Sequence, residues 1–154
     1  MKNTIEQKQT KVGIKKLDEK ATVPSYGSEF AAGADLYACI EGDIEIKPHT
    51  TVVVPTGIAL ELPEGLAGLI YARSGLATKK GLAPANKVGV VDCDYRGEVK
   101  VALHNHSEVS QTVSAGERVA QLVITPYLVA EFIEKDELSS TVRGAGGFGS
   151  TGTK

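Results

Sequence analysis

Short apolar runs separated by turn signals are the feature of this sequence that most constrains its fold. Turn-forming groups such as PSYGS, KPHT, PTG, PEG and SAGE recur at short intervals, and they are rich in the residues that tight turns require. Between them lie β-branched runs such as TVVVPTGIALEL, EVKVALHN and RVAQLVI. Many short strands at this spacing predict an all-β sandwich or barrel. No long stretch shows the 3.6-residue period of an amphipathic helix.

Composition narrows the class of protein further. A net charge of −2, 5% aromatic residues and the lack of Trp argue against a nucleic-acid surface. The N-terminal segment has no apolar signal region and no run approaches a membrane span. Cys39 and Cys93 are far apart and have no CxxC spacing, which predicts free thiols. We therefore expect a cytoplasmic protein with neither a nucleic acid nor a membrane as partner.

The 154 residues are expected to form one folded domain with two less regular ends. We expect residues 1–10 to be a disordered or loosely ordered extension because they are polar. Residues 11–134 should form the β domain. Residues 135–154 should form a C-terminal arm that ends in a flexible Gly-rich tail.

One short helix is predicted in the stretch ARSGLATKKGLAP. Ser74 suits the N-cap, Lys79 and Lys80 suit the last turn, and Gly81 can close the helix. Gly75 keeps the first turn open to another group, so this end could bind an anion. The same residues also suit an ordinary capped surface helix.

The stretch KVGVVDCDYRGEVKVALHN predicts a β-hairpin that turns around residues 94–97. Asp92 follows an apolar run and is a candidate general base, since a carboxylate is ionised at neutral pH unless it is buried. Asp92 and Asp94 would share a face only if the strand continued through both. Asp94 is better explained as a turn residue.

The histidines are weaker candidates for a functional site. His104 and His106 form an H-x-H that could point one way from a strand and hold a metal, but no third ligand has a matching spacing. His49 is a lone turn histidine. We expect no metal role for them.

Five blocks together resemble the trimeric dUTPases, which are dUTP pyrophosphatases, in the order that this family has. The blocks are AGADLYA (32–38), ARSGLA (72–77), GVVDCDYRGEV (89–99), GERVAQLVI (116–124) and RGAGGFGSTG (143–152). The resemblance implies a jelly-roll β-sandwich subunit, a homotrimer with active sites shared between subunits, and Mg²⁺. It also implies hydrolysis of dUTP to dUMP and pyrophosphate, which limits uracil incorporation into DNA and supplies dUMP for thymidylate synthesis.

The resemblance assigns roles to residues of the third block and its surroundings. Asp92 would orient and deprotonate the water that attacks the α-phosphorus. Tyr95 would pack against deoxyribose and leave no space for a 2′-hydroxyl. The remaining positions expected to contact uracil or deoxyribose are Asn86, Gly89, Val90, Val91, Lys100 and, from the tail, Phe148.

The other blocks would bind the phosphates. The resemblance places Arg73, Ser74, Gly75, Gln121, Arg143, Gly149, Ser150 and Thr151 at the triphosphate. The tail would close over the site as a lid, with Phe148 stacked on uracil. Mg²⁺ would be held mainly by the phosphates and by water, with Asp35 as support from the outer shell.

Two other functions use the same scaffold. A dCTP deaminase would be expected to have a second serine and an arginine after Ser74, and a separate glutamate for deamination. A non-catalytic, regulatory nucleotide-binding module would be indicated by loss of Asp92, Tyr95 or the tail, and all three are present.

Overall fold

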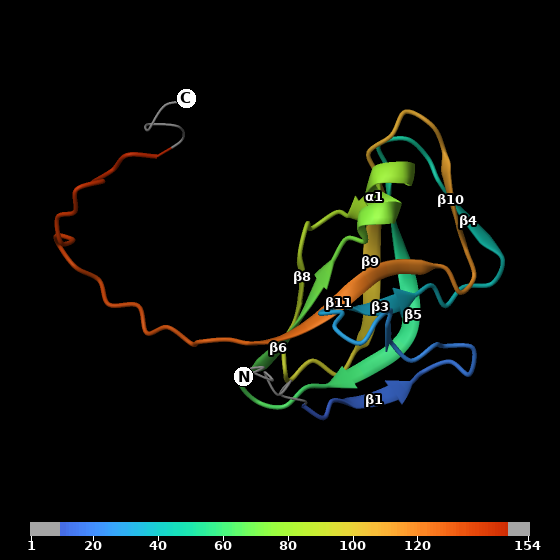
Figure 1. The fold of residues 1–154 in the computed structure, drawn as a ribbon, viewed down its shortest axis with the longest axis horizontal. Helices are drawn as coiled ribbons and strands as arrows, with labels where there is room; N and C mark the ends of the chain where they lie inside the picture. The colour runs from blue at the N-terminus through green and yellow to red at the C-terminus, as the bar shows by residue number, and fades with distance from the viewer. Residues whose placement is uncertain (1–9, 148–154) are drawn as a thin grey trace, which may run out of the picture.

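A computed structural model, which describes residues 10–147, confirms the all-β prediction (Figure 1). This part of the chain contains eleven strands and one short helix. The elements are β1 Gly13–Lys16, β2 Ser25–Tyr26, β3 Ala34–Tyr37, β4 Asp43–Ile46, β5 Thr51–Glu61, β6 Leu66–Tyr71, α1 Ser74–Lys80, β7 Leu82–Pro84, β8 Gly89–Val91, β9 Glu98–Asn105, β10 Gln111–Ser114 and β11 Arg118–Pro126. Each apolar run quoted above lies in a strand.

The strands form two main sheets and one small one. The four-stranded sheet has the order β1-β5-β9-β7, and the five-stranded sheet has the order β2-β3-β11-β6-β8. Strands β10 and β4 pair separately. All these pairs are antiparallel. Most neighbours in a sheet are therefore distant in the sequence, as a sandwich requires.

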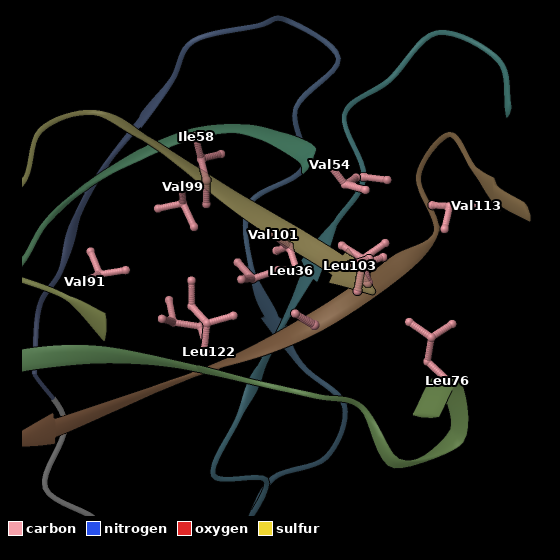
Figure 2. Close-up of a cluster of buried hydrophobic side chains, with 14 of the residues drawn as sticks. Leu36, Val54, Ile58, Leu76, Val91, Val99, Val101, Leu103, Val113 and Leu122 are labelled. Atoms are coloured by element: carbon pink, nitrogen blue, oxygen red, sulfur yellow. The ribbon is translucent and has the colours of Figure 1, made fainter. Parts of the chain in front are cut away.

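The core lies between the two main sheets. Strand β9 shows the period of two: Val99, Val101 and Leu103 are buried, whereas Lys100 and His104 point to the other face. Figure 2 shows the buried side chains of β9 gathered with residues from β3, β5, β8 and β11. This shared core fixes the relative position of the sheets, and with it the position of the loops between them.

The predicted hairpin around residues 94–97 is wrong. Strand β8 pairs with β6, from Gly68 opposite Val91 to Ile70 opposite Gly89. Strand β9 pairs with β5 and β7 instead. The segment between β8 and β9 therefore connects the two sheets. The backbone groups of the two strands are hydrogen-bonded to other strands. The local sequence pattern could not reveal these partners.

Helix α1 ends where it was predicted to end but begins one residue earlier than expected. Arg73 is the N-cap, in an extended conformation, and Ser74 is the first helical residue, so Ser74 is not the cap. Gly81 closes the helix in the left-handed conformation with φ of 66°, as predicted. Within residues 10–147, no helix is long and apolar enough to cross a membrane.

The C-terminal arm leaves the body of the protein after β11. Residues 127–147 contain neither helix nor strand, and Figure 1 shows them running away from the sheets, in orange to red. Leu128, Phe132 and Val142 on this arm are almost fully exposed. The boundaries predicted at residues 10 and 134 stay predictions.

Asn105, which is fully buried at the end of β9, should be a stability determinant. Its amide nitrogen donates to the carbonyls of Ile46 and Val109 at 2.9 and 2.8 Å, and its amide oxygen accepts from the backbone N–H and the hydroxyl of Ser107. Asn105→Ala should lower the free energy of unfolding by about 2–4 kcal/mol, because it leaves these buried groups unpaired. Urea unfolding at fixed protein concentration measures the loss. His106→Ala, at an exposed neighbour, should change stability little, and an equal loss in both variants would contradict this role.

Candidate active site

A pocket of about 260 Å³ opens where β8 and β9 diverge. Nearly all the residues predicted to contact a nucleoside line it. They are Asn86, Gly89, Val90, Val91, Asp92, Tyr95 and Lys100, joined by Ile70, Glu98 and Val99. Its volume is near the lower end of the roughly 300–1,000 Å³ typical of small-molecule sites, so one nucleoside-sized group suits it.

Unpaired strand edges form two walls of this pocket. Among residues 10–147, strand β8 is the last strand of its sheet and has β6 as its only neighbour. Strand β9 pairs with β7 only from Leu103 to Asn105, so Glu98 to Lys100 have no strand partner on that side within the described residues. Backbone N–H and C=O groups are strong hydrogen-bonding groups that seek partners. The open edges can therefore bind the polar rim of a flat ligand.

Asp92 stands at the mouth of the pocket. Strand β8 ends at Val91, and Asp92 begins a turn in which the Tyr95 N–H donates to the Asp92 carbonyl at 3.2 Å. The strand does not continue, so the condition for Asp92 and Asp94 to share a face is not met. The Asp92 side chain is exposed and has no hydrogen-bond partner among residues 10–147. An accessible carboxylate in this place can accept a proton from water.

The Tyr95 ring is held against the backbone of Gly97. The Tyr95 hydroxyl donates to the Glu98 carbonyl at 3.1 Å. A Cβ added at Gly97 would overlap the Tyr95 hydroxyl and ring. Glycine at position 97 is therefore what allows this ring position.

A second group of candidates lies around the buried carboxylate of Asp35. Its two oxygens accept from Arg73 Nε at 2.7 Å and from Arg118 Nη1 at 3.2 Å. One carboxylate thus orients two guanidinium groups, which keep further N–H donors for another ligand. We call Asp35, Arg73 and Arg118 the arginine cluster.

Gln121 lies beside the arginine cluster. It faces Asp35 on β3 and Tyr71 on β6 in the strand register. Its amide nitrogen donates to the Ala72 carbonyl at 2.8 Å, which fixes the segment just before Arg73. Ser74 and Gly75 follow on the exposed first turn of α1.

Arg118 is a candidate site residue that the sequence analysis missed. It lies in the block GERVAQLVI, where only Gln121 was assigned a role. It becomes a candidate because it donates a hydrogen bond to Asp35, which is 83 residues away along the chain. The presence of a lone arginine at the start of a strand gave no signal of its own.

The nucleoside pocket and the arginine cluster do not meet within one chain. Val91 pairs with Gly68 on β6, so Asp92 lies near the level of Ala67. Strand β6 continues for four residues beyond Ala67, which is about 13 Å at roughly 3.3 Å per residue, and Arg73 lies past its end at Tyr71. The α- and γ-phosphates of one nucleotide are much closer together than this, so one chain alone does not bring all the predicted residues together.

The predicted tail residues are described only in part. Phe148, Gly149, Ser150 and Thr151 lie outside the described residues. Arg143 is on the exposed arm, where its Nε donates to the Gly146 carbonyl at 2.8 Å. The predicted lid therefore stays a prediction.

The described residues contain no group of three or more His, Cys, Asp or Glu side chains placed to hold a metal ion. The His104 and His106 rings are 4.5 Å apart. The pKa of His106 is lowered, first by desolvation and then by the positive charges of Lys87 and His104. Cys39 and Cys93 are free thiols, and desolvation raises the pKa of Cys39.

Comparison with known proteins identifies the family. The family model described as dUTPase matches residues 19–152. A deoxyuridine 5'-triphosphate nucleotidohydrolase from Hydrogenobaculum sp. is 50% identical over 144 residues, which cover 94% of this chain and 99% of that protein. Its counterpart from Nautilia profundicola is 50% identical over 142 residues, covering 92% and 99%. The chain therefore belongs to the dUTPase family. This confirms the resemblance seen in the sequence and the prediction that the protein is an enzyme.

A solved structure with the same fold supports this assignment. The dUTPase of Staphylococcus bacteriophage 80alpha, solved with dUPNHPP, superposes with a TM-score of 0.86 at 27% identity, over 94% of this chain and 99% of that chain. The similarity confirms the predicted jelly-roll β-sandwich with one short helix.

Proposed function

We propose that this protein hydrolyses dUTP to dUMP and pyrophosphate by attack of a water activated by Asp92. The observation that carries the proposal is the pocket between β8 and β9, which has Asp92 at its mouth and Tyr95 in its wall. The relatives named above are nucleotidohydrolases of deoxyuridine 5'-triphosphate, and the similar phage enzyme binds dUPNHPP. Both support dUTP as the substrate.

Uracil is recognised by the open edges of β8 and β9. Fixed backbone N–H and C=O groups near Val90 and Lys100, together with the Asn86 side chain, match the O4 acceptor and the N3–H donor of uracil. Cytosine presents an amino donor at the same position, so a buried N–H would lose its partner. A site that would leave a buried N–H unpaired discriminates strongly against cytosine.

Deoxyribose packs on Tyr95. The contact of this ring with Gly97 and the bond to the Glu98 carbonyl hold the ring in place. A rigid aromatic wall excludes the 2′-hydroxyl of a ribonucleotide better than a mobile one. The pair Tyr95 and Gly97 therefore sets the choice of sugar.

Asp92 performs the proton transfer. Its carboxylate accepts a proton from a water molecule while the oxygen of that water forms a bond to the α-phosphorus. The bond from the α-phosphorus to the oxygen that bridges to the β-phosphorus breaks, and pyrophosphate leaves with the bonding electrons. The products are dUMP and pyrophosphate.

The arginine cluster binds the phosphates. Arg73 and Arg118 offer guanidinium N–H groups that match phosphate oxygens, and Asp35 fixes their orientation. Ser74, Gly75 and Gln121 add polar groups beside them. Arg143, with Gly149, Ser150 and Thr151 of the tail, completes the phosphate site when the lid closes, and Phe148 covers uracil.

Mg²⁺ fits this arrangement only as a partner of the substrate. No carboxylate cage exists among the described residues, and both Asp35 oxygens already accept from arginines. The ion would then be held by phosphate oxygens and water, which suits its reluctance to lose water. Asp35 can accept a hydrogen bond from such a water. When bound, Mg²⁺ neutralises charge on the phosphates.

The enzyme acts as a homotrimer whose sites are shared between subunits. Asp92 and Arg73 lie toward opposite ends of β6, which spans about 13 Å from Ala67 to Tyr71, and this supports a site built from the pocket of one chain and the arginine cluster of another. The exposed arm supports sharing too (Figure 1). From Lys135 to Arg143, nine residues can reach up to about 30 Å, enough to meet a neighbour.

An apolar groove supports assembly as well. Its volume is about 1140 Å³, and its lining includes Ile14, Tyr26, Leu66 and Ile124. The arm carries apolar side chains that are exposed in one chain, among them Phe132. Exposed apolar surface on this scale is typical of an interface.

The cellular role follows from the reaction: dUTP removal limits uracil incorporation into DNA, and the dUMP formed serves thymidylate synthesis. The free thiols of Cys39 and Cys93 fit the reducing cytoplasm predicted for the protein.

The first test of the proposal is pyrophosphate release from dUTP, dCTP, dTTP and UTP. We expect dUTP to be preferred by at least about 10²-fold, and Asp92→Asn to lower kcat by about 10²–10⁴-fold while the nucleotide still binds. Ammonia release from dCTP would identify a deaminase instead. Binding of dUTP without any turnover would identify a regulatory module.

A second prediction concerns the choice of sugar. Gly97→Ala should displace the Tyr95 ring and lower the ratio of kcat/KM for dUTP to that for UTP by about tenfold. Gly27→Ala is the control, because an added Cβ there meets nothing within 4 Å. An unchanged ratio in Gly97→Ala would assign sugar discrimination to other residues.

A third prediction tests the shared site. Asp92→Asn and Arg73→Ala are each expected to be nearly inactive. Unfolding them together in equal amounts and reassembling them should restore activity to about a quarter of wild type, because a quarter of random sites would combine both intact parts. A second pair, Asp92→Asn with a chain lacking residues 143–154, should behave in the same way.

Controls make this experiment decisive. Each variant reassembled alone should stay inactive, and wild type taken through the same treatment should recover. If each site used a single chain, no mixed trimer would contain a complete site. A mixture that had demonstrably exchanged subunits and still hydrolysed no dUTP would rule out sharing.

A further inference from the structure

An ion pair fastens the C-terminal end of α1. Lys80 Nζ donates to Glu117 Oε1 at 2.7 Å and to the Thr112 carbonyl at 2.9 Å. Glu117 Oε2 accepts from the Ser114 N–H at 3.0 Å. The side chains of Lys80 and Glu117 are 37% and 26% exposed, so this pair is screened less by solvent than a surface pair.

The ion pair joins the two segments that carry the arginines. Lys80 is the last residue of α1, and Arg73 is the N-cap of the same helix. Glu117 directly precedes Arg118, the first residue of β11. Since Arg73 and Arg118 also meet at Asp35, the contacts form a closed ring through the helix, the carboxylate and the start of β11.

Little else holds α1 in position. The helix has seven residues, and Leu76 is its only buried side chain. A helix of this length is not stable without tertiary contacts. Its orientation therefore depends on contacts at its two ends. At the second end, Lys80 with Glu117 supplies the side-chain contact, beside the His106 N–H that donates to the Gly81 carbonyl at 2.8 Å.

We propose that Lys80 and Glu117 are positioning residues that set the affinity of the arginine cluster for phosphate groups. Neither side chain touches the substrate. The pair fixes the separation and direction of Arg73 and Arg118 before the nucleotide arrives, so less order has to be gained on binding. The inference rests on the proposed phosphate-binding role of these arginines.

Calorimetric binding of pyrophosphate with Mg²⁺ tests this inference without any turnover. Lys80→Met and Glu117→Gln should each weaken pyrophosphate binding by about three- to tenfold. In dUTP hydrolysis, KM should rise by a similar factor while kcat stays within about twofold. Inhibition by deoxyuridine, which needs only the nucleoside pocket, should not change.

Lys79→Met is the matched control, because Lys79 is an exposed neighbour on the same turn with no partner among residues 10–147. It should bind pyrophosphate like wild type. Lys80→Arg keeps the charge and the donors and should bind within about twofold of wild type. Circular dichroism checks folding, and Glu117→Gln serves if Lys80→Met does not fold.

Three results would overturn the inference: wild-type pyrophosphate affinity in Lys80→Met and Glu117→Gln, an equal loss in Lys79→Met, or a loss of kcat with unchanged KM. If wild type released no pyrophosphate from dUTP but pyrophosphate binding responded as expected, the positioning role would stand and the dUTP assignment would fall.

Discussion

The candidate site depends on one constraint: β8 and β9 are consecutive strands that belong to different sheets. A connection as short as Asp92–Gly97 would normally join two paired strands. Here β8 pairs with β6 and β9 pairs with β5. The edges of β8 and β9 that face each other therefore stay unpaired, and the two strands diverge. The divergence creates the pocket, leaves backbone groups for a ligand and places Asp92 at the opening.

Charge placement provides the second part of the site. Asp35 is buried on β3, where an ionised carboxylate needs partners. Arg73, the N-cap of α1, and Arg118, the first residue of β11, supply them. Partly buried ion pairs of this kind contribute little to net stability but hold their members in a defined geometry. Two guanidinium groups directed by one carboxylate are well suited to a polyphosphate.

The sequence predicted the features that are local. The β-branched run EVKVALHN marks β9, because each strand carries its own pattern. Pairing is not local, so the hairpin prediction failed where β8 and β9 chose partners elsewhere. The N-cap was placed one residue late because Arg73, which gives no cap signal, adopts the extended conformation.

The candidate site was recovered unevenly for the same reason. The pocket residues are close in sequence and could be predicted together from one block. Arg118 was missed because its role comes from Asp35, 83 residues away. Local patterns reveal what a segment can form, whereas partners from distant segments decide how its side chains are used.

The open edges of β8 and β9 also bear on solubility. Backbone groups that are free to bind a base are equally free to pair with a strand of another molecule, which is how edge strands start aggregation. β8 is only three residues long, and the charged Asp92 follows it at once. A short edge that ends in a carboxylate offers a poor template for a further strand. The chain can thus keep a polar edge open for a small ligand while remaining resistant to strand addition.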